Sequence, residues 1–437
     1  MILGALALVA VLGVLVVSIA YGMRRPFRVL ALYAAIVPFG SGIVVHSPLP
    51  SSLSTASSLL GLFATGCLAL QVFLTRQRSP RLLSAMPVWL LLAGLSACTY
   101  FWSVNPSATA QQVLALAALV ALFVFALLAH ADAHDLHWFE GAVIAGGAAT
   151  GAYAIGLLLL GRLTTSTDTV PRFATAGGAG APDPNITAAS LLLPLMLAVS
   201  WALSRRSPRV RLIAGAAAAA TLTGILLTGS RGGLIAAVLG CLVLAGTSKR
   251  AITALAVVAL AAAVAVFITP NNVRARLTSS ESTGRENVWQ VGLRACSTYC
   301  IAGSGAETFP DVYAATLFTN PDLVAHGTEN YKAHNLWLAF LVEEGVAGVA
   351  LGAIAFALVF ADLRRVADRR RRAAPAAAVV ALLASNVFLN NFAFKYFWLV
   401  LIYAGMVALV HGRSDADRAP TAAGTLDADR DRQLLGV

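Results

Sequence analysis

Long apolar runs, separated by short polar segments, constrain this chain more than any other feature of its sequence. A membrane-spanning helix needs about 20 mostly apolar residues. Barrel strands would alternate apolar and polar residues, and these runs do not. We therefore predict an all-α integral membrane protein, a polytopic bundle of about 12 to 13 transmembrane helices. The runs fall at about 2–21, 29–45, 59–75, 82–103, 111–131, 141–160, 186–203, 212–228, 234–247, 251–268, 335–360, 375–391 and 396–411.

Composition excludes a soluble protein. The chain is 58% hydrophobic and only 12% charged, whereas a soluble domain carries about 25% charged residues. A net charge of +11 would point to nucleic acid in a soluble chain. In a chain surrounded by membrane lipids we interpret the charge as a topology signal, with no nucleic-acid partner. Positive charges follow the first apolar run, which favours a retained span over a cleaved signal peptide.

The polar connections alternate in charge along the chain. By the positive-inside rule the cation-rich set is cytoplasmic and the other set is external. Thirteen spans place the N-terminus outside, and twelve place both ends inside. The cation-rich set comprises Arg24, Arg25 and Arg28; Arg76, Arg78 and Arg81; Arg205, Arg206, Arg209 and Arg211; Lys249 and Arg250; the arginines from Arg364 to Arg372; and the tail.

Two external segments are longer than turns. The shorter is 161–184, and the longer, 269–333, can form a subdomain with helices of its own. This predicts four regions: transmembrane helices with the short loop at 1–268, a large periplasmic loop subdomain at 269–333, C-terminal transmembrane helices at 334–411, and a disordered cytoplasmic tail at 412–437.

Cysteine and histidine clusters raise the question of metal binding. Cys296 and Cys300 lie in the large external loop, where we favour a disulfide because a zinc site needs two more ligands. The stretch His130 to Glu140 contains three histidines but no closing ligand cluster, so we interpret it as a solvated interfacial loop. We expect no metal site.

External cations beside apolar runs mark the first candidate sites, because charges among spans are costly. Arg172 precedes Asn185 at the head of a span. The alternative is structural, because Asp183 or Asn185 can cap that helix and a loop this rich in glycine and proline needs no function. Arg231 lies in a glycine-rich TGSRGGL turn. Its guanidinium and the nearby amides can bind an anion, or the turn can simply join two helices.

Two further places lie around the large loop. Arg285 stands four residues before Trp289, on one face if the segment is helical, and an interfacial helix would look similar. Ser282 or Thr283 followed by Glu286 resembles a capping box. His334 immediately precedes a long span, either as a helix-start residue or as a proton acceptor. Glu343 and Glu344 lie deeper in that span and need partners.

Taken in order, these motifs resemble the bacterial O-antigen ligase and polysaccharide polymerase superfamily. The resemblance covers most of the chain from about Arg172 to Gly412. It rests on order and membrane placement, since no single motif is specific. The motifs are Asp183, Pro184 and Asn185; Ser230, Arg231 and Gly232; Arg285 and Trp289; Gly303 and Gly305; and His334, Asn335, Glu344 and Gly345.

The resemblance implies a metal-independent GT-C-type glycosyltransferase of the bacterial inner membrane, working without a cofactor on the periplasmic face. Its donor would be a glycan on undecaprenyl diphosphate, and in a ligase the acceptor would be lipid A-core. Arg231, Arg285 and Arg172 would bind the diphosphate, since arginine forks match phosphate oxygens. His334 would accept the proton of the acceptor hydroxyl, with a pKa near working pH. Asn185, Asn335, Trp289 and Glu344 are secondary candidates.

Other functions remain open on the sequence. A lipid or anionic-solute transporter would also have many spans and external arginines, but such folds often contain inverted repeats, and we see none. A scaffold would leave the His-Asn and Ser-Arg-Gly placements without a role. Ligase and polymerase share these motifs, and we favour ligase because the large loop is compact.

Overall fold

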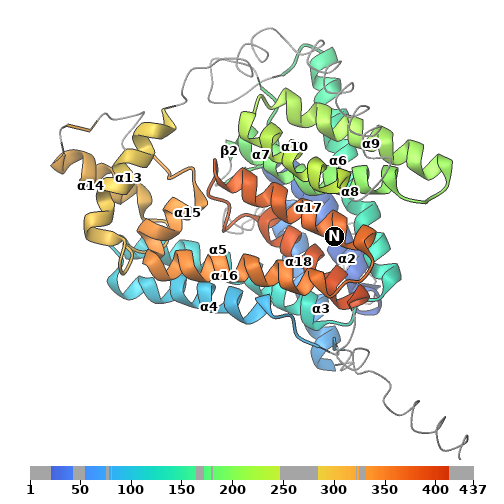
Figure 1. Cartoon of the computed structure of the whole chain (residues 1–437), viewed down its shortest axis with the longest axis horizontal. Helices are drawn as coiled ribbons and strands as arrows, with labels where there is room; N and C mark the ends of the chain where they lie inside the picture. Colours follow the sequence, from blue (N-terminus) through green and yellow to red (C-terminus); the bar gives the residue numbers. More distant parts are fainter. Residues whose placement is uncertain are drawn as a thin grey trace, which may run out of the picture.

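A computed structural model of the chain describes residues 21–42, 55–74, 78–79, 81–163, 172–178, 181–246, 284–320, 322–323 and 331–412. Helices dominate these residues, and Figure 1 shows most of them packed lengthwise into a bundle. Within the described residues, seven helical segments are long and apolar enough to cross a membrane, and three shorter apolar helices accompany them. The prediction of an all-α, polytopic membrane protein is therefore confirmed.

The first half of the bundle contains α2 (Pro26–Ile36), the 3-10 turn η1 (Val37–Gly42), α3 (Ala56–Leu74), α4 (Ala85–Cys98) with η3 (Thr99–Trp102), α5 (Pro106–Leu128) and α6 (Ala133–Leu159). The second half contains the hairpin β1 (Gly177–Gly178) and β2 (Ala181–Pro182), then α7 (Pro184–Ser190), α8 (Leu192–Leu203), α9 (Pro208–Leu227) and α10 (Arg231–Ala245). After these come α13 (Arg285–Tyr299), α14 (Phe309–Thr319), α15 (Leu336–Ala339), the π-helical turn η4 (Phe340–Glu344), α16 (Gly345–Arg364), α17 (Arg369–Asn386) and α18 (Lys395–His411). The predicted runs at 2–21 and 251–268 and most of the tail lie outside the described residues.

Local chemistry explains where many helices begin. Proline is tolerated in the first turn, where no intrahelical partner is lost, and it opens α2, α5, α7 and α9. Side chains of Asn105, Asp132 and Ser207 accept hydrogen bonds from the first turns that follow them. The Asp132 cap corrects one prediction: the histidine-containing stretch is mostly the start of α6 and not a loop.

Cations of the predicted cytoplasmic set gather at one end of the bundle. Arg81 donates to the Ala408 carbonyl at the end of α18 at 2.9 Å. The Asp362 carboxylate, beside Arg365, accepts from the Ser84 amide at 3.1 Å. Arg28 lies 5.0 Å from the Trp138 ring, at the start of α6. The alternation of loop charge thus corresponds to two opposite ends of the bundle. We call the end where these cations gather the cationic end.

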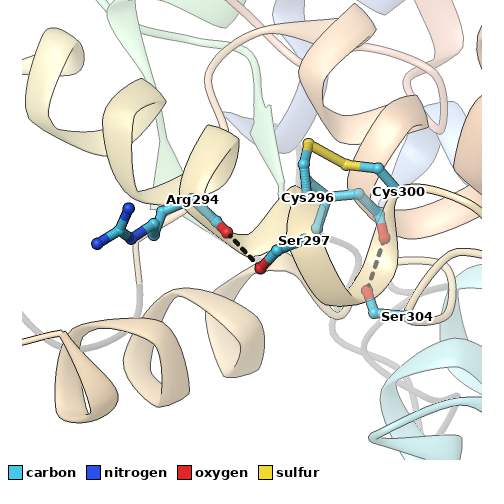
Figure 2. Close-up of a disulfide and its surroundings, with 6 residues drawn as sticks. Arg294, Cys296, Ser297, Cys300 and Ser304 are labelled. Atoms are coloured by element: carbon cyan, nitrogen blue, oxygen red, sulfur yellow. Dashed lines mark hydrogen bonds between the residues drawn. A yellow bond between two sulfur atoms is a disulfide. The ribbon is translucent and has the colours of Figure 1, made fainter.

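The large loop carries two helices, α13 and α14, which Figure 1 shows to one side of the bundle. Their small core includes Val288, Val291 and Phe309, and it continues into Leu338 and Val342 of the following span. The described part of the loop therefore packs onto that span. A disulfide joins Cys296 to Cys300 in the last turn of α13 (Figure 2), with Cα atoms 4.4 Å apart.

The span after His334 is not one regular helix, as its apolar run suggested. It is interrupted at η4, and Gly345 has a φ of 75° and a ψ of −170°, a conformation open almost only to glycine. Carbonyls at the break accept bonds from the large loop: Val342 from the Ser304 amide at 2.8 Å and Glu343 from the Gly305 amide at 3.0 Å. The break is therefore the place where the loop joins the bundle.

Glycines at this junction give a test of stability. A Cβ at Gly303 would lie 2.2 Å from the Glu343 carbonyl oxygen, and one at Gly345 would lie 2.3 Å from the Ile301 carbonyl oxygen. Both have positive φ, so Gly303→Ala and Gly345→Ala should each lower the free energy of unfolding by about 1–3 kcal/mol. Thermal unfolding of the purified protein measures this. Gly94→Ala is the matched control, since no atom lies within 4 Å of its added Cβ, and equal midpoints for all three variants would contradict the prediction.

Candidate functional site

Five segments from different parts of the sequence meet at the end of the bundle opposite the cationic end. They are the extended segment at Arg172, the start of α7, the start of α10, and the pair formed by α13 and the residues before α15. We call this the outer site. Its contacts can be followed from one segment to the next.

The segment at Arg172 lies beside the end of α9, just before α10 begins. The amide of its neighbour Phe173 donates to the Leu227 carbonyl at the end of α9, at 2.9 Å. Arg231 begins α10 four residues later, after Gly229 at a φ of 62° turns the chain and Ser230 caps the new helix. Arg172 is buried, with 4% of its surface exposed. The arginine is therefore packed inside the protein and is not exposed to solvent.

The start of α7 packs against the start of α10. An added Cβ on Gly233 would lie 2.6 Å from the Ala188 methyl, so only glycine permits this approach. At the head of α7 the Asp183 carboxylate accepts from the amides of Asn185 and Ile186 at 2.6 and 3.1 Å. Asp183 is therefore the residue that caps α7. Asn185 takes part in the cap through its backbone amide.

Phe388 connects α10 to the large loop. Its ring atoms would lie 2.9 Å from a Cβ on Gly232, and the Arg285 guanidinium carbon lies 6.0 Å from the ring centroid. Phe388 thus packs beside Gly232, the residue after Arg231, and also lies near the Arg285 guanidinium. The predicted capping box is wrong, because Gly284, at a φ of 71°, is the N-cap of α13 without a side-chain bond.

His334 is held from two directions. Four residues after Arg285, the Trp289 indole donates to the Ala333 carbonyl at 3.2 Å. On the other side, the Asn335 side chain caps α15 by accepting from the amides of Trp337 and Leu338. His334 itself has a φ of 45°. Such backbone strain in a residue other than glycine persists only where surrounding contacts impose it, and it clusters at functional sites.

The electrostatic environment keeps the His334 imidazole neutral. Burial of the ring and the neighbouring Arg285 guanidinium lower the pKa of His334 to about 4, against an opposing effect of the Asp183 carboxylate. We expected an ordinary imidazole pKa near working pH. The sequence did not show that the ring would be enclosed beside a guanidinium. A neutral ring can accept a proton at neutral pH.

Glu344 lies apart from the outer site. One of its carboxylate oxygens accepts from the Ser96 hydroxyl at 2.9 Å, and only 3% of the residue is exposed. Neighbouring Glu343 accepts from the Phe309 amide at 3.1 Å. Through these bonds Glu344 connects the helix break to α4, and Glu343 connects it to α14. The expectation that such deep carboxylates need partners is met for both.

Comparison with known proteins identifies the segment that holds most of these residues. The family model described as O-antigen ligase matches residues 215–352 of the 437-residue chain. This segment, about a third of the chain, is therefore similar to the O-antigen ligase family. This confirms the resemblance to the O-antigen ligase and polymerase superfamily. No curated protein matches the chain.

The O-antigen ligase segment includes Arg231, Arg285, Trp289, His334 and Asn335. Arg172 and the start of α7 lie before it and join the outer site only in the folded chain. Members of the family are glycosyltransferase-like enzymes, and the match supports a function of the O-antigen ligase or polymerase type. Phe388, which follows the segment, had no signal in the sequence because one phenylalanine among many apolar residues is not distinctive.

Proposed function

We propose that this protein transfers a glycan from undecaprenyl diphosphate to a sugar hydroxyl at the periplasmic face of the bacterial inner membrane. In the ligase reaction, which we favour, the acceptor is lipid A-core. The observation that carries the proposal is the enclosed His334 imidazole beside the Arg285 guanidinium, at the same end of the bundle as the segments that carry Arg172 and Arg231. With cationic loops inside, this end is external.

The chemistry divides between the arginines and the histidine. The acceptor oxygen attacks the anomeric carbon while its proton passes to the His334 imidazole. The bond from the anomeric carbon to the diphosphate oxygen breaks, and its electron pair leaves with the diphosphate. Arg231, Arg285 and Arg172 stabilise the negative charge that develops there. The proton then leaves His334 for solvent or the released diphosphate.

A reconstituted reaction tests the proposal. The full chain in vesicles, supplied with lipid-linked glycan and a glycan acceptor, should yield a covalently extended acceptor. Uptake of the lipid or of an anionic solute without covalent transfer would contradict the proposal and support a transporter. A deletion strain separates the two transferases: unligated long chains indicate a ligase, and single repeat units indicate a polymerase.

Independence from metal ions is a further expected result. Because guanidinium groups take the place of a metal ion at the leaving group, transfer should continue in excess chelator. The transfer rate should also not change when Mg²⁺ or Mn²⁺ is added. Measurement of the transfer rate across a chelator titration checks this. Complete loss of transfer, restored by one divalent ion, would mean that carboxylates such as Asp183 hold a metal.

A further inference from the structure

A cavity of about 780 Å³ lies at the cationic end, far along the bundle from the outer site. Side chains of α6, α8, α10, α17 and α18 line it together with the turn after α8. Pockets that bind small molecules have volumes of about 300–1,000 Å³. The cavity is thus large enough for the polar head of a lipid.

Four arginines line this cavity from two sides. Arg205 and Arg206 come from the turn after α8, and Arg370 and Arg371 come from the first turn of α17. Two carboxylates, Glu140 and Asp368, face the same space. With both carboxylates ionised, these six side chains leave an excess of two positive charges.

The carboxylates already have partners. Glu140 accepts from the Trp201 indole at 2.8 Å and from the Tyr403 hydroxyl at 2.9 Å, and it lies 3.8 Å from Arg206. Asp368 caps α17 through the Arg370 amide at 2.9 Å and lies 3.6 Å from Arg371. In the part of the chain that the structure describes, neither carboxylate forms an ion pair with Arg205 or the Arg370 side chain.

The rest of the cavity wall is aromatic and apolar. The Arg206 guanidinium lies 3.8 Å from the Trp201 ring centroid, and the His137 ring stacks on the same indole at 4.9 Å. Apolar side chains of Leu136, Leu244 and Val407 continue the lining. A basic rim with an apolar and aromatic wall, at the level where helices leave the membrane, fits a molecule with an anionic head and apolar chains.

We propose that this cavity binds the head group of an anionic phospholipid of the cytoplasmic leaflet. Arginine forks match the oxygens of a phosphodiester, and basic pockets between helices on this side of a membrane bind such head groups. The site is separate from the outer site and binds its lipid without any bond being made or broken.

The test uses two double variants of the full chain with equal changes of charge. Arg205→Gln with Arg370→Gln alters exposed side chains inside the cavity lining, whereas Arg209→Gln with Arg364→Gln alters exposed side chains at the same end but outside the lining. Binding of phosphatidylglycerol to the delipidated protein in detergent is measured by native mass spectrometry, with phosphatidylcholine and inorganic phosphate as the other probes.

We expect phosphatidylglycerol to bind the natural chain and the second double variant equally, and the first double variant about tenfold or more weakly. Phosphatidylcholine should bind all three weakly. Equal binding of phosphatidylglycerol to both double variants, or equal binding of the two lipids to the natural chain, would overturn the proposal. Displacement of the lipid by millimolar inorganic phosphate would assign the cavity to a soluble anion and overturn the lipid assignment.

Discussion

The His334→Ala variant should transfer glycan about 10²- to 10⁴-fold more slowly than the natural protein, the usual contribution of a general base. Donor binding should be nearly unchanged, because the arginines remain. Hydrogen bonds at Ala333 and Asn335 hold the backbone on both sides of the residue, so we expect the loop to keep its position. Single-turnover transfer measured beside donor binding separates the two effects.

The pH profile identifies His334 more directly. As a general base the imidazole must be neutral, so kcat/KM should fall only as pH drops through its pKa of about 4. Arg285 lowers this pKa, and Arg285→Ala should therefore move the acidic limb to higher pH. The limb should be missing from the residual activity of His334→Ala.

Two other histidines serve as controls for this variant. His134→Ala changes an exposed ring at the cationic end, where its partner is Trp138, and it should keep full activity. His326, which belongs to the same large loop but lies outside the described residues, should tolerate alanine far better than His334. Poor donor binding by His334→Ala with an unchanged pH profile would make the histidine a diphosphate ligand, and the base would then lie elsewhere.

Alanine at Arg231 or Arg285 should reduce transfer strongly while the protein still folds and inserts. Loss of one charge-assisted contact to phosphate costs about 1.5–3 kcal/mol, which is about a 10- to 150-fold loss of rate. Lysine at either position should restore only part of the activity, because it has no planar fork. Arg172 is the third candidate, and its burial means that alanine there should also lower stability.

The matched control is Arg294→Ala on the same helix as Arg285. Its guanidinium donates to Asn320 at 3.0 Å and lies 3.8 Å from Asp322, so it belongs to the surface of the large loop. If Arg231 and Arg285 hold one diphosphate, a double-mutant cycle should show coupling between them of about 0.5 kcal/mol or more. Full activity in both single alanine variants would reject the diphosphate assignment.

Hydropathy and loop charge determined most of the membrane architecture. Apart from 2–21 and 251–268, which lie outside the described residues, every predicted apolar run overlaps one or more helices. The two classes of loop lie at opposite ends. These properties are local: a run of apolar residues must satisfy its backbone within a helix, and loop cations set the side on which each helix ends. Starts of helices, such as the Pro184 and Arg231 positions, follow from the same local chemistry.

The tertiary structure alone decided how the site is assembled. Phe388 between Gly232 and Arg285, and the indole of Trp289 on the Ala333 carbonyl, are contacts across long stretches of sequence. The displaced pKa of His334 also arises from its neighbours in space. At Gly303 and Gly345 two backbones approach too closely for any side chain, and this approach breaks the span at η4. Such features depend on which surfaces meet after the helices have formed, and no local pattern of residue types records that.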